Sequence, residues 1–98
     1  MVKKVLWSIE AKKQLKDAYE YIREDSLQNA IKVRKEIVES VRNLPQHPEK
    51  YNPDKYKYSN DGSYRAFERH RYRISYSVLE NEIRILRIRH TSMEPLEY

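Results

Sequence analysis

Apolar residues recur at helical spacing in two stretches of the N-terminal half of the chain. The first stretch has four such positions at i, i+4, i+7 and i+11: Ala11, Leu15, Ala18 and Ile22. These positions form one face of an α-helix. Ser8 stands where an N-cap is expected, and Glu10 falls in the first turn, where a negative charge suits the helix dipole. We therefore expect a helix that begins after Ser8 and ends near Glu24.

The second stretch predicts a helix with a wider apolar surface. Its main stripe is Ala30, Val33, Ile37, Val41 and Leu44, and a flanking stripe is Leu27, Ile31 and Val38. Together the stripes cover roughly 160° of the helix surface, which favours burial against both another helix and a sheet. Asp25 or Ser26 can cap this helix at its start, and Pro45 and Pro48 end it.

The C-terminal half has the pattern of strands. Residues 72–79 alternate most clearly, with Tyr72, Ile74, Tyr76 and Val78 on one face and Arg71, Arg73, Ser75 and Ser77 on the other. Residues 64–70 and 83–89 predict two further strands, and residues 2–7 predict a short one. The pair Ile85-Leu86 breaks the alternation, which we interpret as the sign of a central strand. Residues 45–63 hold three prolines and the only glycine, so they form a loop whose tyrosines can pack on the domain.

This order of elements predicts an α+β fold in one domain, residues 1–98. An N-terminal strand precedes a two-helix hairpin and a three-stranded antiparallel meander, and the helices pack on one face of a small, mostly antiparallel sheet. The other face of the sheet is expected to stay open and to carry Arg71 and Arg73.

Charge and composition narrow the classes of function. The net charge is +5 and the pI is near 9.4, and seven of the ten arginines fall between Arg65 and Arg89. A basic net charge of this size is compatible with a polyanionic partner. The absence of cysteine excludes disulfides and thiol chemistry, and one glycine leaves no glycine-rich phosphate loop. No apolar run approaches the roughly 18 residues of a membrane span, so we expect a cytoplasmic protein without a membrane partner.

A few side chains are candidates for chemistry. Arg65, Arg73, Arg87 and Arg89 lie on neighbouring predicted strands, and a guanidinium matches phosphate or carboxylate with a planar set of donors. The alternative is a solvated strand face with weak ion pairs to nearby glutamates. His90 can act as a general acid or base, or it is an ordinary histidine at a strand end. Tyr98 is the last residue. The scattered histidines do not predict a metal site, and no cofactor is expected.

The ordered set of these segments resembles the RelE/ParE superfamily of toxins from type II toxin–antitoxin modules, including proteins of the plasmid-stabilisation type. The likeness covers nearly the whole chain. It comprises residues 11–22 and 30–48 of the helices, Tyr64-Arg65, residues 72–76, and residues 85–90 of the strands.

The resemblance implies one of two activities. RelE-like members cut mRNA on the ribosome, and ParE-like members inhibit DNA gyrase. In the RelE-like case Arg65 and Arg73 would contact phosphate, and His90 or Tyr98 would transfer protons, without a metal. Two departures weaken this case, because Phe67 and Ser92 stand where RelE-like toxins carry a lysine and an arginine. The long helical hairpin looks more ParE-like.

The resemblance also implies partners. A cognate antitoxin would neutralise the toxin and can build larger toxin–antitoxin assemblies, and the target would be ribosome-bound mRNA or DNA gyrase. Arg71, Arg87 and Arg89 would then bind either RNA phosphate or an acidic antitoxin segment. A third alternative is a non-toxic family member whose basic sheet face serves only to bind the antitoxin.

Overall fold

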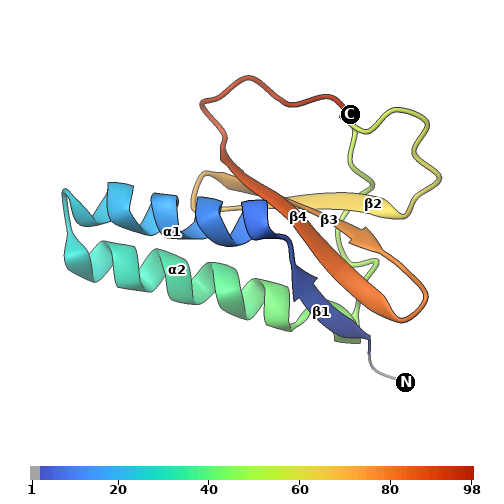
Figure 1. Ribbon diagram of the computed structural model, residues 1–98, viewed down its shortest axis with the longest axis horizontal. Helices are drawn as coiled ribbons and strands as arrows, with labels where there is room; N and C mark the ends of the chain where they lie inside the picture. The colour runs from blue at the N-terminus through green and yellow to red at the C-terminus, as the bar shows by residue number, and fades with distance from the viewer. Residues whose placement is uncertain (1–2) are drawn as a thin grey trace.

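A computed structural model describes residues 3–98 of the chain. Its elements follow the predicted order of one strand, two helices and three strands (Figure 1). They are β1 (Lys4–Trp7), α1 (Ile9–Arg23), α2 (Leu27–Arg42), the short 3-10 helix η1 (Leu44–Gln46), β2 (Tyr64–Arg69), β3 (Tyr72–Val78) and β4 (Glu82–His90). The α+β prediction is confirmed. Part of the predicted first strand, at Val2, lies outside the described residues.

Serine side chains cap both long helices: Ser8 as predicted, and Ser26 of the two candidates Asp25 and Ser26. The Ser8 hydroxyl accepts a hydrogen bond from the Ala11 N–H at 2.9 Å, and the Ser26 hydroxyl accepts one from the Asn29 N–H at 3.1 Å. Each bond satisfies a backbone donor that has no partner within the helix. Ser8 also donates to the Leu86 carbonyl at 2.9 Å. The start of α1 is therefore fixed to β4 as well as capped.

The four strands form one mixed sheet in the order β1-β4-β3-β2. β1 pairs with β4 in parallel, and the other two pairings are antiparallel. β4 is central, as predicted, but the reason differs from the one expected. Tyr76 pairs with Ile85 and Ser75 pairs with Arg87, so Leu86 is the extra residue of a β-bulge. The bulge reverses which side of the sheet the later residues of β4 face.

The core lies between the helices and one face of the sheet. The helices contribute small and branched residues, and the strands contribute isoleucines, two tyrosines and one phenylalanine: Ala11, Ala18, Val33, Ile37, Val41, Phe67, Tyr72, Ile74, Tyr76, Ile83, Ile85 and Ile88. Ile37, Ile74, Tyr76, Ile83 and Ile85 are fully buried. Each such side chain contributes roughly 1.5–3 kcal/mol through the apolar surface it removes from water. This layer is the main source of stability.

The flanking stripe of α2 is not buried as its width predicted. Leu27 is 53% exposed and Ile31 is 52% exposed, whereas the main stripe from Ala30 to Val41 is buried. The two helices lie side by side and extend beyond the sheet (Figure 1), so no strand covers the far end of the hairpin. None of the described helices combines the length and the hydrophobicity that a membrane span requires.

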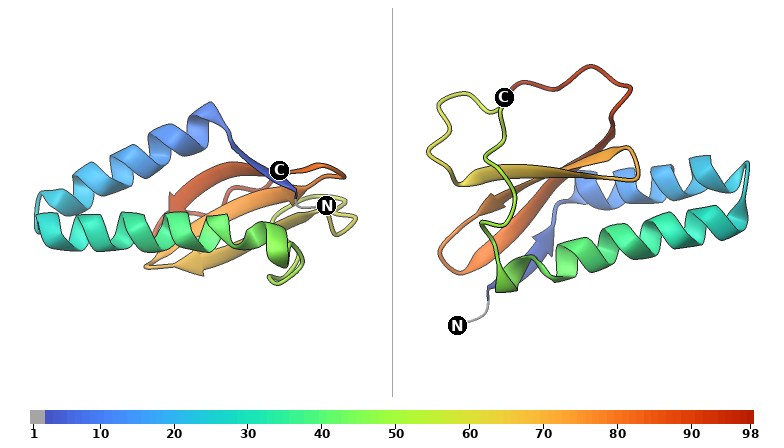
Figure 2. Two further views of the ribbon diagram at one scale, coloured as in Figure 1. Left: turned by 90° about the horizontal axis from the view of Figure 1, so that it is seen from below. Right: turned by 180° about the vertical axis from the view of Figure 1, so that it is seen from behind.

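The face of the sheet opposite the helices is partly covered, which corrects the expectation of a fully open face. Two irregular segments contribute to this cover: the tyrosine loop, residues 47–63, through Asp54 and Tyr56, and the strap, residues 91–98. The start of the tyrosine loop packs on the helix side instead, where Tyr51 stacks on Phe67. The strap leaves β4 and ends beside the tyrosine loop (Figures 1 and 2). The Tyr98 N–H donates to the Tyr56 carbonyl at 3.0 Å, and the Tyr58 N–H donates to the Tyr98 carbonyl at 2.5 Å.

Candidate functional site

A small cleft lies on this second face, between the sheet, the tyrosine loop and the strap. β3 contributes Arg73 and Ser75, and β4 contributes Arg87 and Arg89. The register places Arg73 opposite Arg89 and Ser75 opposite Arg87. The cleft measures about 70 Å³, well below the several hundred Å³ typical of a ligand pocket. In this closed arrangement it has no room for a nucleotide.

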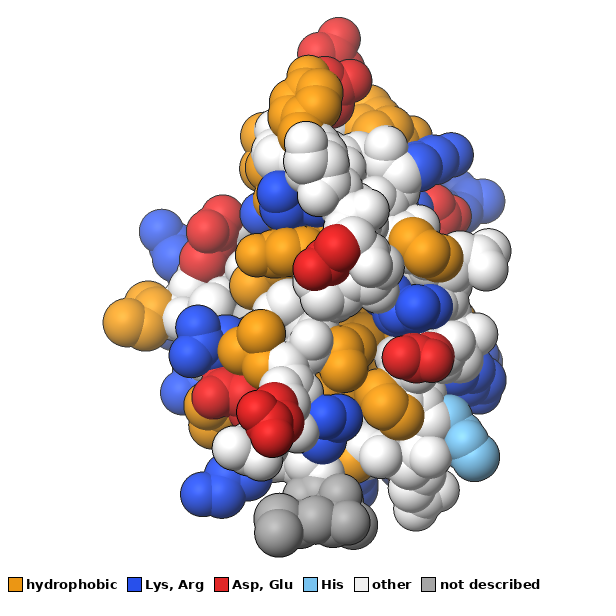
Figure 3. Space-filling view, turned by 90° about the vertical axis from the view of Figure 1, so that its right-hand side faces the viewer, with side chains coloured by type: hydrophobic (Ala, Val, Ile, Leu, Met, Phe, Trp, Pro, Cys, Tyr) orange, Lys and Arg blue, Asp and Glu red, His pale blue; other side chains and the backbone are white. Residues whose placement is uncertain are grey.

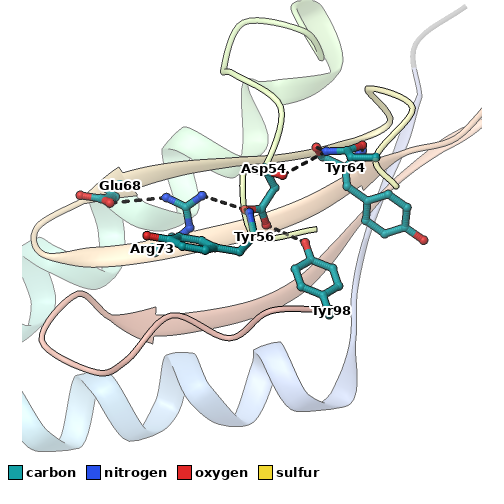
Figure 4. A network of polar contacts seen from close by, with 7 residues as sticks. Asp54, Tyr56, Tyr64, Glu68, Arg73 and Tyr98 are labelled. Atoms are coloured by element: carbon teal, nitrogen blue, oxygen red, sulfur yellow. Dashed lines mark hydrogen bonds and ion pairs between the residues drawn. The ribbon is translucent and has the colours of Figure 1, made fainter. Parts of the chain in front are cut away.

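Asp54 of the tyrosine loop is the centre of the polar contacts in the cleft (Figure 4). Its residue exposure is only 2%. Arg73 Nη2 donates to Asp54 Oδ1 at 2.8 Å, and the Tyr98 hydroxyl donates to Asp54 Oδ2 at 2.6 Å. The Tyr56 N–H also donates to Oδ1, at 3.1 Å. Because buried charge is tolerated only when it is paired and hydrogen-bonded, this carboxylate needs all three donors.

The network fixes the protonation states of its members. Burial raises the pKa of Asp54, but the hydrogen bonds from Tyr98, Arg73 and the Tyr56 N–H outweigh it and leave the pKa below its ordinary value. Burial, followed by the hydrogen bond to Asp54, raises the pKa of Tyr98 well above its ordinary value. Asp54 is therefore a carboxylate and Tyr98 a neutral phenol at neutral pH. A phenol held in this state is not a general base.

The remaining arginines of the cleft contact the strap. The Arg87 guanidinium lies 3.9 Å from the centre of the Tyr98 ring, within the range of a cation–π interaction. Arg89 Nη2 donates to the Glu94 carbonyl at 3.0 Å. Arg73 is stacked at 4.9 Å over the Tyr56 ring and makes a longer contact of 3.5 Å with Glu68. Each of the three guanidiniums therefore already contacts another group of the protein.

His90 lies at the rim of the cleft and packs on the side of the sheet that faces α1. Its ring meets Tyr72 edge-on, with ring centroids 5.1 Å apart. It also lines a groove beside α1 with Gln14 and Tyr21. The Ser92 N–H donates to His90 Nδ1 at 3.0 Å. Ser92 thus orients the histidine, and the two residues continue the turn that leads into the strap.

Arg65 is not part of the cleft, which corrects the expected pairing with Arg73. Arg65 stands opposite the buried Tyr76, whereas Arg73 stands opposite Glu68, so the two side chains leave opposite faces of the sheet. Arg65 Nε donates to the Gly62 carbonyl at 3.0 Å, and Nη1 donates to the Tyr51 carbonyl at 2.7 Å. Its role is to hold the two ends of the tyrosine loop.

Arg71 also departs from its expected place beside Arg73. It lies in the turn between β2 and β3 with φ of 68°, in the left-handed region, and its side chain is not among those lining the cleft. Its carbonyl accepts a hydrogen bond from the Thr91 N–H at 2.8 Å. Arg71 therefore fixes the start of the strap through its backbone.

Phe67 belongs to the core, and its surroundings explain why a lysine would not suit this position. It is 6% exposed and stacks on Tyr51 with ring centroids 4.3 Å apart. Tyr51 belongs to the tyrosine loop, so the expectation that loop tyrosines pack on the domain is confirmed here. Tyr58, in contrast, is 64% exposed.

Sequence reasoning missed Asp54, although it is the central group of the cleft. The available signal was weak, because Asp54 is an acidic residue after a proline in a polar loop. The end of the molecule seen in Figure 3 presents basic, acidic and hydrophobic side chains side by side. Within residues 3–98, no three histidine, aspartate or glutamate side chains gather in a way that suits a metal ion.

Comparison with known proteins gives a family match over most of the chain. The family described as "ParE toxin of type II toxin-antitoxin system, parDE" matches residues 5–95. No curated protein matches this sequence.

Two solved structures share the fold. One is "Chromosomal ParDE TA system from P. aeruginosa", with a TM-score of 0.70 and 26% identity, covering 91% of this chain and 96% of that one. The other is "The structure of YoeB dimer from Staphylococcus aureus", with a TM-score of 0.61 and 21% identity, covering 92% of this chain and 98% of that one. The strand, the helical hairpin, the mixed sheet and the family match over residues 5–95 lead to one conclusion: the chain belongs to the ParE toxin family of type II toxin–antitoxin systems.

Proposed function

We propose that the protein is a growth-arresting toxin that binds a protein target, DNA gyrase in the ParE-like manner, and does not cut RNA. The observation that carries this proposal is the engagement of Arg73 and Tyr98 by one buried carboxylate, Asp54. An RNA-cleaving site needs a free guanidinium to meet the scissile phosphate and a group ready to move a proton. Here the guanidinium is already neutralised and the phenol keeps its proton.

The placement of the other two candidate residues supports the same conclusion. Arg65 bonds to loop carbonyls on the far side of the sheet from Arg73. His90 packs against Tyr72 and is oriented by Ser92. A general acid or base must come within hydrogen-bond reach of the reacting group, and Arg65 does not reach the cleft that His90 borders. A binding mechanism does not require the two residues to converge.

A cognate antitoxin would complete the system. Membership of a toxin–antitoxin family implies such a partner, and the net charge of +5 favours an acidic one. We expect the gene beside this one to encode it, and both proteins to act in the cytoplasm, where gyrase works. Co-expression with that neighbouring gene should restore growth.

RNA cleavage is the second candidate function, because one observation favours it. Arg73, Arg87 and Arg89 line a single cleft with His90 at its rim. If the strap and the tyrosine loop were displaced on the ribosome, three guanidiniums could face one phosphate. The test below therefore measures both activities in the same cells.

The test is inducible expression in bacteria, with a reporter of DNA damage and primer extension along abundant mRNAs read together. The proposal predicts growth arrest, a DNA damage response and intact mRNA. His90→Ala should arrest growth as the wild type does, and His47→Ala, in the tyrosine loop, is its matched control. Loss of arrest in His90→Ala, with cleavage of mRNA by the wild type, would establish the second candidate instead. Normal growth on induction of the wild type would identify a non-toxic binding module.

A further inference from the structure

The strap is held to the molecule by few interactions. Glu94, Leu96 and Glu97 are exposed, so the strap removes little apolar surface from water. Its contacts with the tyrosine loop concentrate at its end, where Tyr98 makes two backbone hydrogen bonds and its hydroxyl meets Asp54. Segments with few buried apolar contacts open most readily. Tyr98 is therefore the main anchor of the closed strap, and the exposed hydrogen bond from the Tyr58 hydroxyl to Glu97 adds a second contact with the tyrosine loop.

The groups that contact the cleft arginines in the closed state indicate what the cleft can bind. The strap places the Tyr98 ring on Arg87 and the Glu94 carbonyl on Arg89, whereas the carboxylate on Arg73 comes from Asp54 of the tyrosine loop. These are a carboxylate, a peptide carbonyl and a phenol ring, all of them protein groups. The strap also carries Glu94 and Glu97, with the sequence Glu-Pro-Leu-Glu-Tyr over residues 94–98. It is an acidic peptide that ends in an aromatic residue and rests on a basic face.

We propose that the strap is an autoinhibitory segment that occupies, within the molecule, the binding site for an acidic, aromatic-bearing segment of a partner protein. The partner segment binds the cleft only after Tyr98 leaves Asp54. On release, Arg87 loses its aromatic cover and Arg89 loses its carbonyl partner, so both guanidiniums become available for carboxylates. The strap and the partner segment compete for Arg87 and Arg89, while Arg73 stays paired with Asp54 of the tyrosine loop. This inference concerns partner access and stands apart from the target of the toxin.

The competition makes partner binding depend on the hydroxyl of one tyrosine. Tyr98→Phe keeps the ring over Arg87 but removes the hydrogen bond to Asp54. A hydrogen bond to a charged group is among the stronger ones, so its loss should raise the population of the open strap about tenfold or more. Tyr98→Ala removes the ring as well and should open the strap further. Tyr19→Phe, on α1, is the matched control, because Tyr19 packs under Arg34 away from the strap.

The experiment uses the full chain and two readouts. Hydrogen exchange at the Tyr58 N–H, which donates to the Tyr98 carbonyl, reports opening of the strap. Fluorescence anisotropy reports binding of a labelled peptide with the sequence of residues 93–98. We expect Tyr98→Ala to bind this peptide at least tenfold more tightly than the wild type, Tyr98→Phe to lie between them, and Tyr19→Phe to match the wild type. The same peptide with phenylalanine at its end should bind Tyr98→Ala more weakly.

Three outcomes would overturn the proposal. One is equal peptide binding by the wild type and both Tyr98 variants, and another is unchanged exchange at Tyr58 in Tyr98→Phe. The third is binding of an RNA oligonucleotide by Tyr98→Ala in preference to the acidic peptide, because the partner class would then be wrong. If Tyr98→Ala does not fold by circular dichroism, the comparison of Tyr98→Phe with Tyr19→Phe decides. Neither readout involves gyrase or growth, so a failure here is separate from a failure of the proposed function.

Discussion

The two faces of the sheet are covered in different ways. On the helix side, α1 and α2 bury a continuous set of apolar residues that includes Ile37, Ile74 and Ile85, each with no exposed surface. On the cleft side, the tyrosine loop and the strap meet around a single carboxylate, Asp54. Apolar burial is distributed over many contacts, whereas a buried polar network fails when one member is lost. The first face is therefore suited to stability and the second to a change of state.

The largest change in stability is expected for a substitution on the helix side of the sheet. Ile37→Ala removes a fully buried side chain from the centre of α2 and leaves a cavity, which should lower the free energy of unfolding by about 3–4 kcal/mol. Ile31→Ala, on the same helix but 52% exposed, should change it by less than about 0.5 kcal/mol. Urea denaturation of both variants measures the difference. Similar losses in the two variants would contradict the layered core described above.

A smaller loss of stability is expected for a substitution of Asp54, at the centre of the cleft. Asp54→Asn removes the charge that pairs with Arg73 and weakens the hydrogen bond from Tyr98. It should therefore lower the free energy of unfolding by roughly 2 kcal/mol. Asp17→Asn, on the exposed surface of α1, is the matched control and should change stability by less than about 0.5 kcal/mol. Hydrogen exchange should show that amide protection is lost mainly in the strap and the tyrosine loop. Protection lost first in the helices would show that Asp54 serves the core instead.

The contribution of Asp54 should also depend on pH. Its pKa is lower in the folded protein than its ordinary value of 3.8. Stabilisation by this carboxylate is therefore fully present above that ordinary value and is lost as the pH falls through the folded pKa. The difference in unfolding free energy between the wild type and Asp54→Asn should accordingly shrink between neutral pH and pH 3. A difference that stays constant over this range would mean that the pKa of Asp54 is not lowered.

The smallest predicted effect compares two tyrosine hydroxyls. Tyr76 is fully buried and its hydroxyl donates to the Pro48 carbonyl at 3.0 Å, while burial raises its pKa to about 12. Tyr76→Phe leaves that carbonyl without its donor and should cost about 1 kcal/mol. Tyr58→Phe removes a hydroxyl that meets Glu97 in solvent, and it should lower the stability much less than Tyr76→Phe does. Thermal unfolding in parallel samples resolves the two values.

The sequence predicted the helices and β3 because their signals are local. Ser8 and Ser26 cap the helices they precede, and the alternation from Tyr72 to Val78 defines the two sides of β3. The inward position of Arg65 was also readable, since it is two residues before the buried Phe67 and shares its side of β2.

The positions of Arg87 and Asp54 in the cleft could not be predicted from such local signals. Strict alternation from Ile83 and Ile85 would place Arg87 on the core side, and only the bulge at Leu86 turns it toward the cleft. The position of Asp54 depends on contacts with Arg73 and Tyr98, which lie 19 and 44 residues away in the chain. Loop side chains that meet across such separations leave no periodic pattern in the sequence.

Binding of gyrase without RNA cleavage can be measured with the purified protein in two parallel reactions. One reaction measures supercoiling of relaxed plasmid by DNA gyrase, and the other measures mRNA integrity by primer extension during cell-free translation. Supercoiling should stop when the protein reaches the concentration of gyrase, while the mRNA stays intact. Cleavage within translated mRNA, with supercoiling unaffected, would contradict the proposed function.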